Sequence, residues 1–329
     1  MLTTHRLRII ACLLALCLSS PGWSQDSVKT GTVLRIMTFN AWGAGRNAGK
    51  PVDETVAAIR AAGADIIGIQ EMRAEADDCS AEVCPPGGGQ PATAEIARAL
   101  GFNYMDQPSD DVALWANAVI SRYPIETLSP HGLGARIDVN GQKVVIFNIH
   151  LTDYPFQPYQ ALDIPYGEAP FLHTAPELAE AAVKARGDAI QELKNEMEFA
   201  DGAVATFVTG DFNEPSWRDW TDRAVAAGHQ PLAVRFPSAL AVEDMGFIDS
   251  YRAIRSDEVA LPGLTWTPTT ADDDPADHHD RIDYIFVRGK GVNIFNAQIV
   301  GEDSAHADIV STPWPSDHRA VVTTVQLPE

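Results

Sequence analysis

Basic residues are scarce in this chain of 329 residues. Lys and Arg together number 24, against 45 Asp and Glu, and the formal net charge at pH 7 is −21. Proteins that coat nucleic acids through phosphate contacts need concentrated Lys and Arg, so the charge argues against that class. It does not exclude an enzyme that meets phosphate through a bound cation, because the cation then supplies the positive charge.

Cysteine is rare as well, with four residues in the whole chain. This excludes a disulfide-dense mini-protein, and a hydrophobic share of 45% excludes a disordered chain because it supplies a core. The length permits one large domain or two ordinary ones. Since we find neither a linker nor a fixed-period repeat, we predict a single domain over residues 25–329.

Long apolar runs are missing too, because none reaches the roughly 20 residues that a transmembrane helix needs. The apolar run Ile9–Leu18 follows the basic residues Arg6 and Arg8 and precedes Pro21 and the small Ser24. This order is typical of a secretory signal peptide. We therefore predict cleavage of residues 1–24, no transmembrane segment afterwards, and a periplasmic or extracellular location.

Removal of that segment would leave two cysteines, Cys79 and Cys84. In an exported chain, two cysteines this close favour a small disulfide. A zinc site would need more ligands nearby than this stretch offers. We predict a disulfide between Cys79 and Cys84 that staples a loop and takes no part in chemistry.

Short apolar runs typical of buried strands alternate with helical stretches along the chain. This alternation predicts an α/β domain. The predicted strands are Val33–Phe39, Ile66–Ile69, Ala116–Ser121, Val144–Ile149, Ala205–Thr209, Ile282–Val287 and Ala320–Val325, and the predicted helices are Asp53–Ala62, Ala92–Leu100 and Pro176–Phe199.

Many of these runs end in, or adjoin, residues that can bind a metal ion or a phosphate. A single Asn, Asp or Gly at a strand end is ordinary turn chemistry. A set that combines carboxylates, amides and two histidines is harder to attribute to turns. The set consists of Asn40, Gln70, Glu71, Asn148, His150, Asp211, Asn213, Asp283, Asp317 and His318.

The motifs that contain these residues resemble those of the endonuclease/exonuclease/phosphatase superfamily, and they follow one another in the family's order. They are Thr38-Phe39-Asn40, Gln70-Glu71, Asn117 to Ile125, Asn148-Ile149-His150-Leu151, Gly210-Asp211-Phe212-Asn213, Arg281-Ile282-Asp283-Tyr284 and Ser316-Asp317-His318-Arg319. The resemblance implies a DNase I-like four-layer α/β sandwich, with two packed mixed β-sheets flanked by helices and the site at one edge of the sheets. It also implies a metal-dependent hydrolase of phosphate esters.

Hydrolysis of a phosphate ester requires neutralisation of the charge on the phosphoryl oxygens, activation of a water molecule and stabilisation of the leaving oxygen. The resemblance implies that Glu71 is the principal metal ligand and that Asn40 and Asp317 occupy auxiliary metal positions. Hard oxygen ligands suit Mg²⁺. We therefore expect Mg²⁺, with Mn²⁺ or Ca²⁺ as alternatives.

Five residues receive catalytic roles from the same resemblance. Asp211 and Asn213 would orient the attacking water and hold a phosphoryl oxygen. His318, with Asp283 fixing its tautomer, forms the carboxylate–imidazole pair that acid–base chemistry needs. His150 would hydrogen-bond the phosphate or protonate the leaving group. Whether Asp211 or His318 takes the proton of the water stays open at this point.

Other residues are predicted to contact the substrate or to set specificity. Asn117 and Asn148 are the predicted substrate-binding amides. The stretch Asp153–Phe171 carries five aromatic residues and four prolines. We expect one of two roles for it: a rigid wall or lid over the substrate, or a surface loop packed by its own side chains. The acidic stretch Asp272–Asp280 could hold another cation or repel polyanions near the site. We favour the third interpretation, a solvated acidic loop.

The expected substrate is a small or lipid-derived phosphate ester, because the chain is acidic and lacks a Lys/Arg cluster. We expect a monomer that forms no stable complex with nucleic acid. The alternative is an extracellular DNase-type endonuclease, which shares the chemistry. A non-catalytic binding module on the same scaffold is the third hypothesis, and the presence of all the predicted catalytic side chains argues against it.

Overall fold

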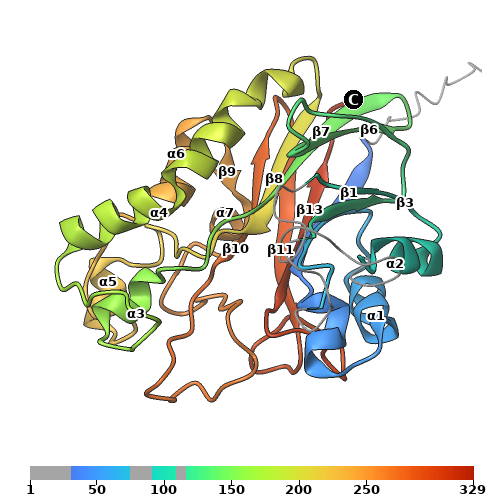
Figure 1. Ribbon diagram of the computed structural model, residues 1–329. Helices are drawn as coiled ribbons and strands as arrows, with labels where there is room; N and C mark the ends of the chain where they lie inside the picture. The colour runs from blue at the N-terminus through green and yellow to red at the C-terminus, as the bar shows by residue number, and fades with distance from the viewer. Residues whose placement is uncertain (1–30, 75–90, 109–115) are drawn as a thin grey trace, which may run out of the picture. The chain divides into compact units, whose positions relative to one another are not determined.

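The computed structural model of the protein describes residues 31–74, 91–108 and 116–329 (Figure 1). The predicted signal segment 1–24 and the predicted Cys79–Cys84 disulfide lie outside the described residues and stay predictions. Among the residues described, no helix has the length and hydropathy to cross a membrane.

The strands occur in the order in which the apolar runs predict them, with further short strands between them. Those of the first sheet are β1 (Val33–Asn40), β2 (Ile66–Gln70), β3 (Asn103–Asp106), β4 (Ala118–Ser121), β11 (Asn293–Gly301), β12 (Ile309–Val310) and β13 (Ala320–Gln326). Those of the second sheet are β5 (Ile125–Leu128), β6 (Gly134–Val139), β7 (Gln142–His150), β8 (Ala205–Asp211), β9 (Ile248–Asp249) and β10 (Asp283–Arg288).

Both sheets are mixed. Within the described ranges, the first has the spatial order β12-β11-β13-β1-β2-β4-β3 and the second the order β5-β6-β7-β8-β10-β9. The pairs β1–β2, β7–β8 and β11–β12 are parallel, and the other pairs are antiparallel. The parallel pairs β1–β2 and β7–β8 lie near the middle of their sheets and end at the same edge.

The helices begin and end at local signals that the sequence carries. Thr174 accepts a hydrogen bond from the backbone N–H of Glu177 at the start of one helix, and Gly63 and Gly101 adopt left-handed conformations at the ends of two others. The helices are α1 (Val52–Ala62), α2 (Thr93–Leu100), α3 (Gln157–Ala161), α4 (Ala175–Asn195), α5 (Asp222–Ala226), α6 (Pro237–Asp244) and α7 (Ser250–Ile254), with 3₁₀ turns η1 (Gly43–Ala48) and η2 (Met197–Ala200).

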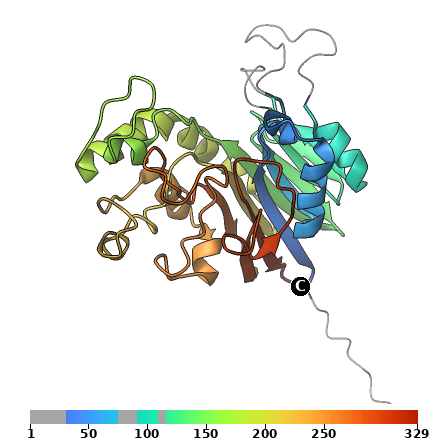
Figure 2. The same cartoon turned by 90° about the horizontal axis from the view of Figure 1, so that it is seen from below.

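Buried side chains fill three interfaces between four layers. Residues such as Ile59 of α1 and Ile96 of α2 pack against one face of the first sheet. A second cluster, which includes Ile36 and Ile146, lies between the two sheets. A third cluster joins the second sheet to α4 and α6 (Figures 1 and 2). This arrangement confirms the predicted four-layer α/β sandwich.

Each predicted strand is present, with its ends shifted by at most two residues. The predicted helix Pro176–Phe199 is shorter than expected, because α4 ends at Asn195 and a 3₁₀ turn follows. The strands that the sequence did not indicate are β3, β5, β6, β9, β11 and β12; they have two to four residues or carry polar residues that are at least partly exposed. Their apolar signal is weak because one face or one edge meets water.

The two sheets approach each other closely behind their shared edge. Gly68 of β2 faces Thr209 and Asn148 of the second sheet, and a Cβ added at Gly68 would lie 2.0 Å from Thr209 Oγ1 and 2.4 Å from Asn148 Oδ1. These two atoms belong to the buried polar network described below. A glycine is therefore required at this position by the space between the sheets.

We predict that Gly68→Ala lowers the free energy of unfolding by about 1–3 kcal/mol, the usual effect of overpacking a core. The matched control is Gly187→Ala in α4, where an added Cβ meets only Val183 Cγ1 at 3.5 Å. The control should raise stability by roughly 0.5–1 kcal/mol, because alanine favours the helix. Urea-induced unfolding measures the free energy of unfolding of both variants. Equal effects of the two substitutions would contradict the close approach of the two sheets at Gly68.

Candidate active site

Strand register brings the predicted polar residues to one edge of the two sheets. Asp211, the last residue of β8, lies opposite His150 at the end of parallel β7 and opposite Asp283 at the start of antiparallel β10. In the facing sheet, β1 ends at Asn40, opposite Gln70 at the end of β2. Because parallel strands end at the same edge, residues far apart in the sequence meet here.

Asp211 is the centre of the cluster. Its Oδ2 accepts a hydrogen bond from Asn40 Nδ2 at 3.0 Å and lies 3.5 Å from His150 Nε2 and 3.6 Å from His318 Nε2. Its Oδ1 accepts a hydrogen bond from the backbone N–H of Asn213 at 2.8 Å. One fully buried carboxylate thus joins four other predicted site residues.

His318 and Asp283 form the predicted carboxylate–imidazole pair. His318 Nδ1 lies 2.9 Å from Asp283 Oδ2, and both residues are buried. Burial alone would lower the pKa of His318, but the negative charges of Asp283 and Asp211 outweigh it and raise that pKa well above its usual value. Nδ1 therefore carries a proton that points at Asp283, and Nε2 faces Asp211.

The loop before β13 holds the ring of His318 in place. Ser316 Oγ donates a hydrogen bond to the backbone carbonyl of Asn40 at 2.7 Å and accepts one from the backbone N–H of His318 at 3.0 Å. The indole of Trp266 packs against the imidazole, with ring centroids 4.9 Å apart. The short motif Ser-Asp-His is thereby tied to the end of β1.

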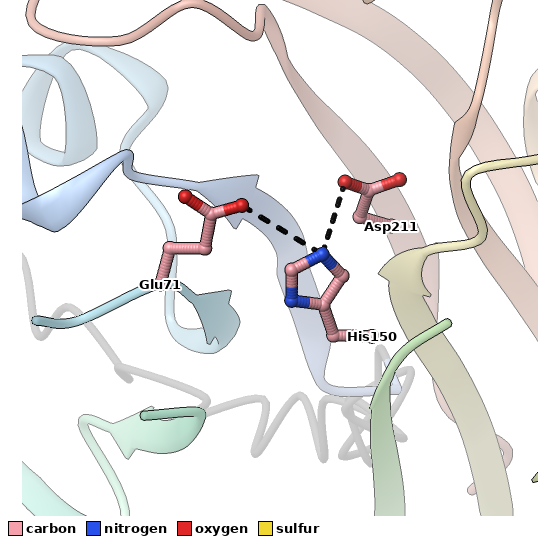
Figure 3. A group of neighbouring side chains, drawn as sticks. All are labelled: Glu71, His150 and Asp211. Atoms are coloured by element: carbon pink, nitrogen blue, oxygen red, sulfur yellow. Dashed lines mark ion pairs between the residues drawn. The ribbon is translucent and has the colours of Figure 1, made fainter. Parts of the chain in front are cut away.

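His150 lies between two carboxylates, as Figure 3 shows. Its Nε2 is 3.7 Å from Glu71 Oε1, 3.5 Å from Asp211 Oδ2 and 3.2 Å from Asn213 Nδ2. Burial and then the charge of His318 lower the pKa of His150 to about 3. A neutral imidazole is a hydrogen-bond partner or a metal ligand rather than an acid, which favours the first of its two predicted roles.

Glu71 follows β2 in a left-handed backbone conformation with φ 53°. Such a conformation is uncommon for a residue with a side chain and is found at functional sites. Here the backbone carbonyl of Glu71 accepts a hydrogen bond from Gly43 at 2.8 Å, and Asn40 Nδ2 donates to Glu71 Oε1 at 2.8 Å. These contacts turn the carboxylate toward Asp211 and His150.

The carboxylates of this edge are chemically suited to a divalent cation. Burial and the nearby charge of Asp317 raise the pKa of Glu71 to about 8, and burial raises the pKa of Asp211 to about 7. A proton or a cation must therefore balance them. Ligand atoms of Glu71, His150 and Asp211 lie within 4.8 Å of one another, which fits a metal ion bound by Glu71 with these neighbours.

Asn40, predicted at an auxiliary metal position, has its amide nitrogen directed at two carboxylates of the site. Its Oδ1 accepts a hydrogen bond from the backbone N–H of Trp42 at 3.1 Å, which fixes the amide with its nitrogen toward Glu71 and Asp211. An amide nitrogen is a donor and does not bind a cation. Held in this way, Asn40 orients the carboxylates, and Asp317 lines the same cavity; the auxiliary metal roles of both residues stay predictions.

Asn148, predicted to bind substrate, has its amide hydrogen-bonded within the protein. Its side chain is buried between the sheets, where Nδ2 donates to the carbonyls of Ile69 and Ala118 at 3.1 Å. Its Oδ1 accepts from Gln70 Nε2 at 2.6 Å and from Thr209 Oγ1 at 3.2 Å. The amide is saturated by the protein, so it joins the two sheets behind the site.

Asn117 is separated from the main cluster. It lines a different cavity of about 360 Å³, on the other side of His150, together with Gln107 and His131. Asn117 therefore shares this second cavity with Asn148 and His150 and does not line the cavity of the main cluster.

The main cluster opens into a cavity of about 270 Å³. Its floor is made of the catalytic candidates, and its walls are largely aromatic. The aromatic residues that line it are Trp42, Phe156, Tyr159, Tyr166 and Trp266.

Three of these aromatic residues come from the predicted specificity stretch Asp153–Phe171. Phe156, Tyr159 and Tyr166 line the cavity, whereas Tyr154 and Phe171 are 43% and 45% exposed. The stretch therefore forms a wall of the cavity, which was one of its two predicted roles.

The acidic stretch Asp272–Asp280 is only partly a solvated loop. Asp277 accepts hydrogen bonds from Tyr159 and Thr270, both at 2.5 Å, and the buried Asp280 accepts one from Trp220 at 2.9 Å. Two of its acids thus hold aromatic and hydroxyl groups in place.

The sequence offered no signal for Trp42 and Trp266 as lining residues. Trp42 follows the end of β1, a position that predicts an ordinary aromatic residue of the core. Trp266 lies in a segment without regular structure that pairs with Asp280 and His318 through isolated bridges. Only those long-range pairings bring its ring to the cavity.

Comparison with known proteins places these features in a family context. The sequence profile described as Endonuclease/Exonuclease/phosphatase family matches residues 37–318. An uncharacterized protein from Caenorhabditis elegans is 25% identical over 316 residues, which cover 90% of this chain and 92% of that protein.

Solved structures share the fold. An endonuclease/exonuclease/phosphatase from Beutenbergia cavernae DSM 12333 matches with a TM-score of 0.53 and 19% identity, covering 90% of this chain and 72% of that one. The 3′ phosphatase NExo from Neisseria, bound to product DNA hairpin, matches with a TM-score of 0.51 and 16% identity over 90% and 100% of the two chains.

We predict that Mg²⁺ or Mn²⁺ raises the melting temperature of the protein and that Glu71→Gln removes most of this stabilisation. A ligand at 100 times its Kd stabilises the native state by about 2.7 kcal/mol. The matched control is Asp303→Asn in a more exposed group of Glu302, Asp303 and His306. Differential scanning calorimetry with and without metal measures the shift in melting temperature. A shift that persists in Glu71→Gln would contradict the assignment of Glu71 as a metal ligand.

Proposed function

The chain belongs to the endonuclease/exonuclease/phosphatase family, whose members are metal-dependent hydrolases of phosphate esters, and from this premise we propose that it is a phosphodiesterase acting on a small or lipid-derived ester. The observation that carries the proposal is the single buried cluster in which Asp211 contacts Asn40, His150, Asn213 and His318. All the groups that the chemistry requires lie within hydrogen-bond or ion-pair distance of that carboxylate or of its immediate neighbours.

A divalent ion, when bound by Glu71 and its neighbours, supplies positive charge against the phosphoryl oxygens and the leaving oxygen. The remaining work belongs to the side chains of the protein. Asp211, Asp283 and His318 are themselves buried, so that their charges act at short range and in a low dielectric.

Asp211 is our choice for the general base. The raised pKa of His318 keeps its imidazole protonated near neutral pH, so it is a poor acceptor for the proton of a water molecule. Asp211 is a carboxylate at the centre of the cluster, 3.6 Å from His318 Nε2, and burial raises its pKa, which makes it a stronger base than an exposed carboxylate. Protonated His318, held by Asp283, would then donate from Nε2 to a phosphoryl oxygen.

The proposed reaction is hydrolysis of one ester bond. The water oxygen forms a new bond to phosphorus, its proton passes to Asp211, and the bond from phosphorus to one alcohol oxygen breaks. The departing oxygen takes up one proton from solvent and Asp211 returns its proton to solvent, so the net products are a phosphomonoester and an alcohol. Asn213, whose Nδ2 also donates to the carbonyl of Leu151 at 2.9 Å, is placed to orient the reacting groups.

A compact substrate is supported by the size and charge of the cavity. Its volume of about 270 Å³ is at the small end for ligand sites. Among the described residues that line it, none is Lys or Arg, the residues that follow a polyanionic backbone. Together with the pattern of residues 1–24, this supports our proposal of an exported enzyme for small esters rather than an extracellular nuclease.

We predict hydrolysis of bis(p-nitrophenyl) phosphate in the presence of Mg²⁺ or Mn²⁺, with kcat reduced about 10²–10⁴-fold by His318→Ala. Asp283→Asn should reduce kcat as well, because the amide neither fixes the tautomer of His318 nor stabilises its charge. Release of p-nitrophenolate measures the rate for each purified variant.

The control is His229→Ala, which removes an exposed histidine outside the cluster and should leave kcat unchanged. Full activity in excess chelator, or equal activity of His318→Ala, would overturn the mechanism. Plasmid DNA and RNA complete the panel. Rapid cleavage of DNA at physiological salt would overturn the preference for a small ester and support the nuclease alternative.

A further inference from the structure

A further polar cavity lies outside the catalytic cluster. Its volume of about 360 Å³ is within the range of small-molecule sites, and none of its described lining residues lines the cavity above Asp211. Its walls come from α5 and the loop after it, from the region after α7 and from the acidic stretch before β10. It reaches the surface at Asp272, whose side chain is 65% exposed.

Most of the charged groups in this lining are paired within the protein. Arg252 Nε and Arg281 Nε donate to the two oxygens of Asp219 at 2.6 and 3.0 Å. Arg281 also pairs with the buried Asp249 at 2.8 Å. Glu258 Oε2 accepts a hydrogen bond from a third arginine at 3.0 Å. These charges balance one another without a ligand.

Asp280 is an exception among the lining residues. It is 1% exposed, and its Oδ1 accepts hydrogen bonds from Trp220 Nε1 at 2.9 Å and from Gln230 Nε2 at 3.2 Å. Its Oδ2 is also buried but accepts no hydrogen bond from the residues that the structure describes. A buried carboxyl oxygen without a donor is costly, so this atom calls for an explanation.

The neighbouring His278 does not satisfy Asp280. Its Nε2 lies 3.6 Å from Asp280 Oδ2 but only 2.8 Å from Gln230 Oε1. Because Gln230 donates to Asp280 through its nitrogen, its oxygen takes the Nε2 proton of His278. Burial and the charge of His279 lower the pKa of His278 to about 4, so the ring is neutral near pH 7. His278 therefore neither donates to Asp280 Oδ2 nor balances its charge.

A second acceptor without a donor lies in the same lining, on His279. Thr270 gives its hydroxyl proton to Asp277 at 2.5 Å, so His279 Nε2, 2.8 Å from Thr270 Oγ1, must donate to it. Burial lowers the pKa of His279, and the neutral ring then has Nδ1 as an acceptor. This buried Nδ1 has no hydrogen-bond partner in the described part of the chain and lies 3.5 Å from another acceptor, Asp272 Oδ1.

The spread of these acceptors favours an organic cation over a single metal ion. Ligand atoms that lie within 4.8 Å of one another occur in three groups of described residues, and none of these groups lines this cavity. A molecule with N–H donors at two points matches the two acceptor positions. Ala224, Pro262 and Leu264 supply an apolar part of the lining, against which an aliphatic chain can pack.

We propose that this cavity binds a small aliphatic diamine or polyamine, with one ammonium group at Asp280 Oδ2 and another at His279 Nδ1 and Asp272 Oδ1. An ammonium group has three N–H donors and no acceptor, as these positions require. Its hydrogen bonds to a carboxylate are charge-assisted and therefore strong. This binding needs none of the catalytic candidates, so it goes beyond the proposed function and stands or fails separately from it.

The first test compares ligands that differ in charge on the wild-type protein. Calorimetry in saturating Mg²⁺ measures the affinity of the diamines from propane-1,3-diamine to hexane-1,6-diamine, of the diols of the same lengths and of the matching monoamines. We expect the best diamine to bind at least about tenfold more tightly than its diol and its monoamine. Equal affinity of the diol or of the monoamine would overturn the proposal.

A variant of the buried acid tests where the diamine binds. Asp280→Asn keeps the size of the side chain and the oxygen that faces Trp220, but it removes the charge and replaces Oδ2 by a donor. We expect it to weaken binding of the best diamine by about tenfold or more. The matched control is Asp273→Asn, which removes an exposed acid of the same stretch that does not line the cavity and should leave the affinity unchanged.

Equal affinity of Asp280→Asn and the wild type would overturn the proposal. The melting temperature of each variant without ligand shows whether it is folded. If Asp280→Asn does not fold, the comparison of diamine with diol on the wild type still decides the outcome.

Two other binding modes are distinguished by the same measurement. Glu71→Gln removes an acid of the catalytic cavity and should leave diamine binding intact; loss of binding in Glu71→Gln together with full binding in Asp280→Asn would place the diamine in the catalytic cavity and overturn the proposal. Titration with Zn²⁺ and Ca²⁺ tests for a metal site. An ion that binds the wild type but not Asp280→Asn, with no diamine bound by either, would overturn the proposal as well.

Discussion

One buried carboxylate, Asp211, governs the arrangement of the candidate site. It ends the central strand β8 and contacts Asn40 of the other sheet, His150 of β7 and His318 of the loop before β13. A buried negative charge is costly unless donors or cations surround it. The two sheets must therefore bring their strand ends together at this point, and the same requirement creates a place for a divalent ion.

The polar network behind the site makes this approach of the sheets possible. Gln70 donates to Asn148 across the interface between the sheets, Thr209 donates to Asn148 within the second sheet, and Gly68 leaves room for them. Buried hydrogen bonds of this kind favour one arrangement, because sliding of the sheets would break the bond from Gln70 to Asn148. The network thus sets the register from which Glu71 and Asp211 project. Residues that resemble substrate ligands in the sequence can in this way be part of the scaffold.

Chemistry and specificity come from different parts of the chain. The catalytic candidates lie on strand ends, where the backbone is held by both neighbours in the sheet. The cavity wall comes from a single inserted stretch, tied to α4 through Arg186 and to the segment before β10 through Tyr159 and Asp277. These supports of the wall, Arg186 and Asp277, are thus separate from the contacts that position Asp211 and His318.

The sequence by itself determined the α/β class, the positions of the main strands and most of the cluster, because strand ends and polar residues coincide in chain order. It identified Glu71, His150, Asp211, Asn213, Asp283 and His318, which the structure brings together. Tertiary structure decided that Asn148 is a scaffold residue, that Asn40 presents its nitrogen to the carboxylates, and that Asn117 faces another cavity. It also brought Trp42 and Trp266 to the cavity. The physical reason is that side-chain direction and hydrogen-bond partners depend on contacts across the two sheets, which no local pattern of residues encodes.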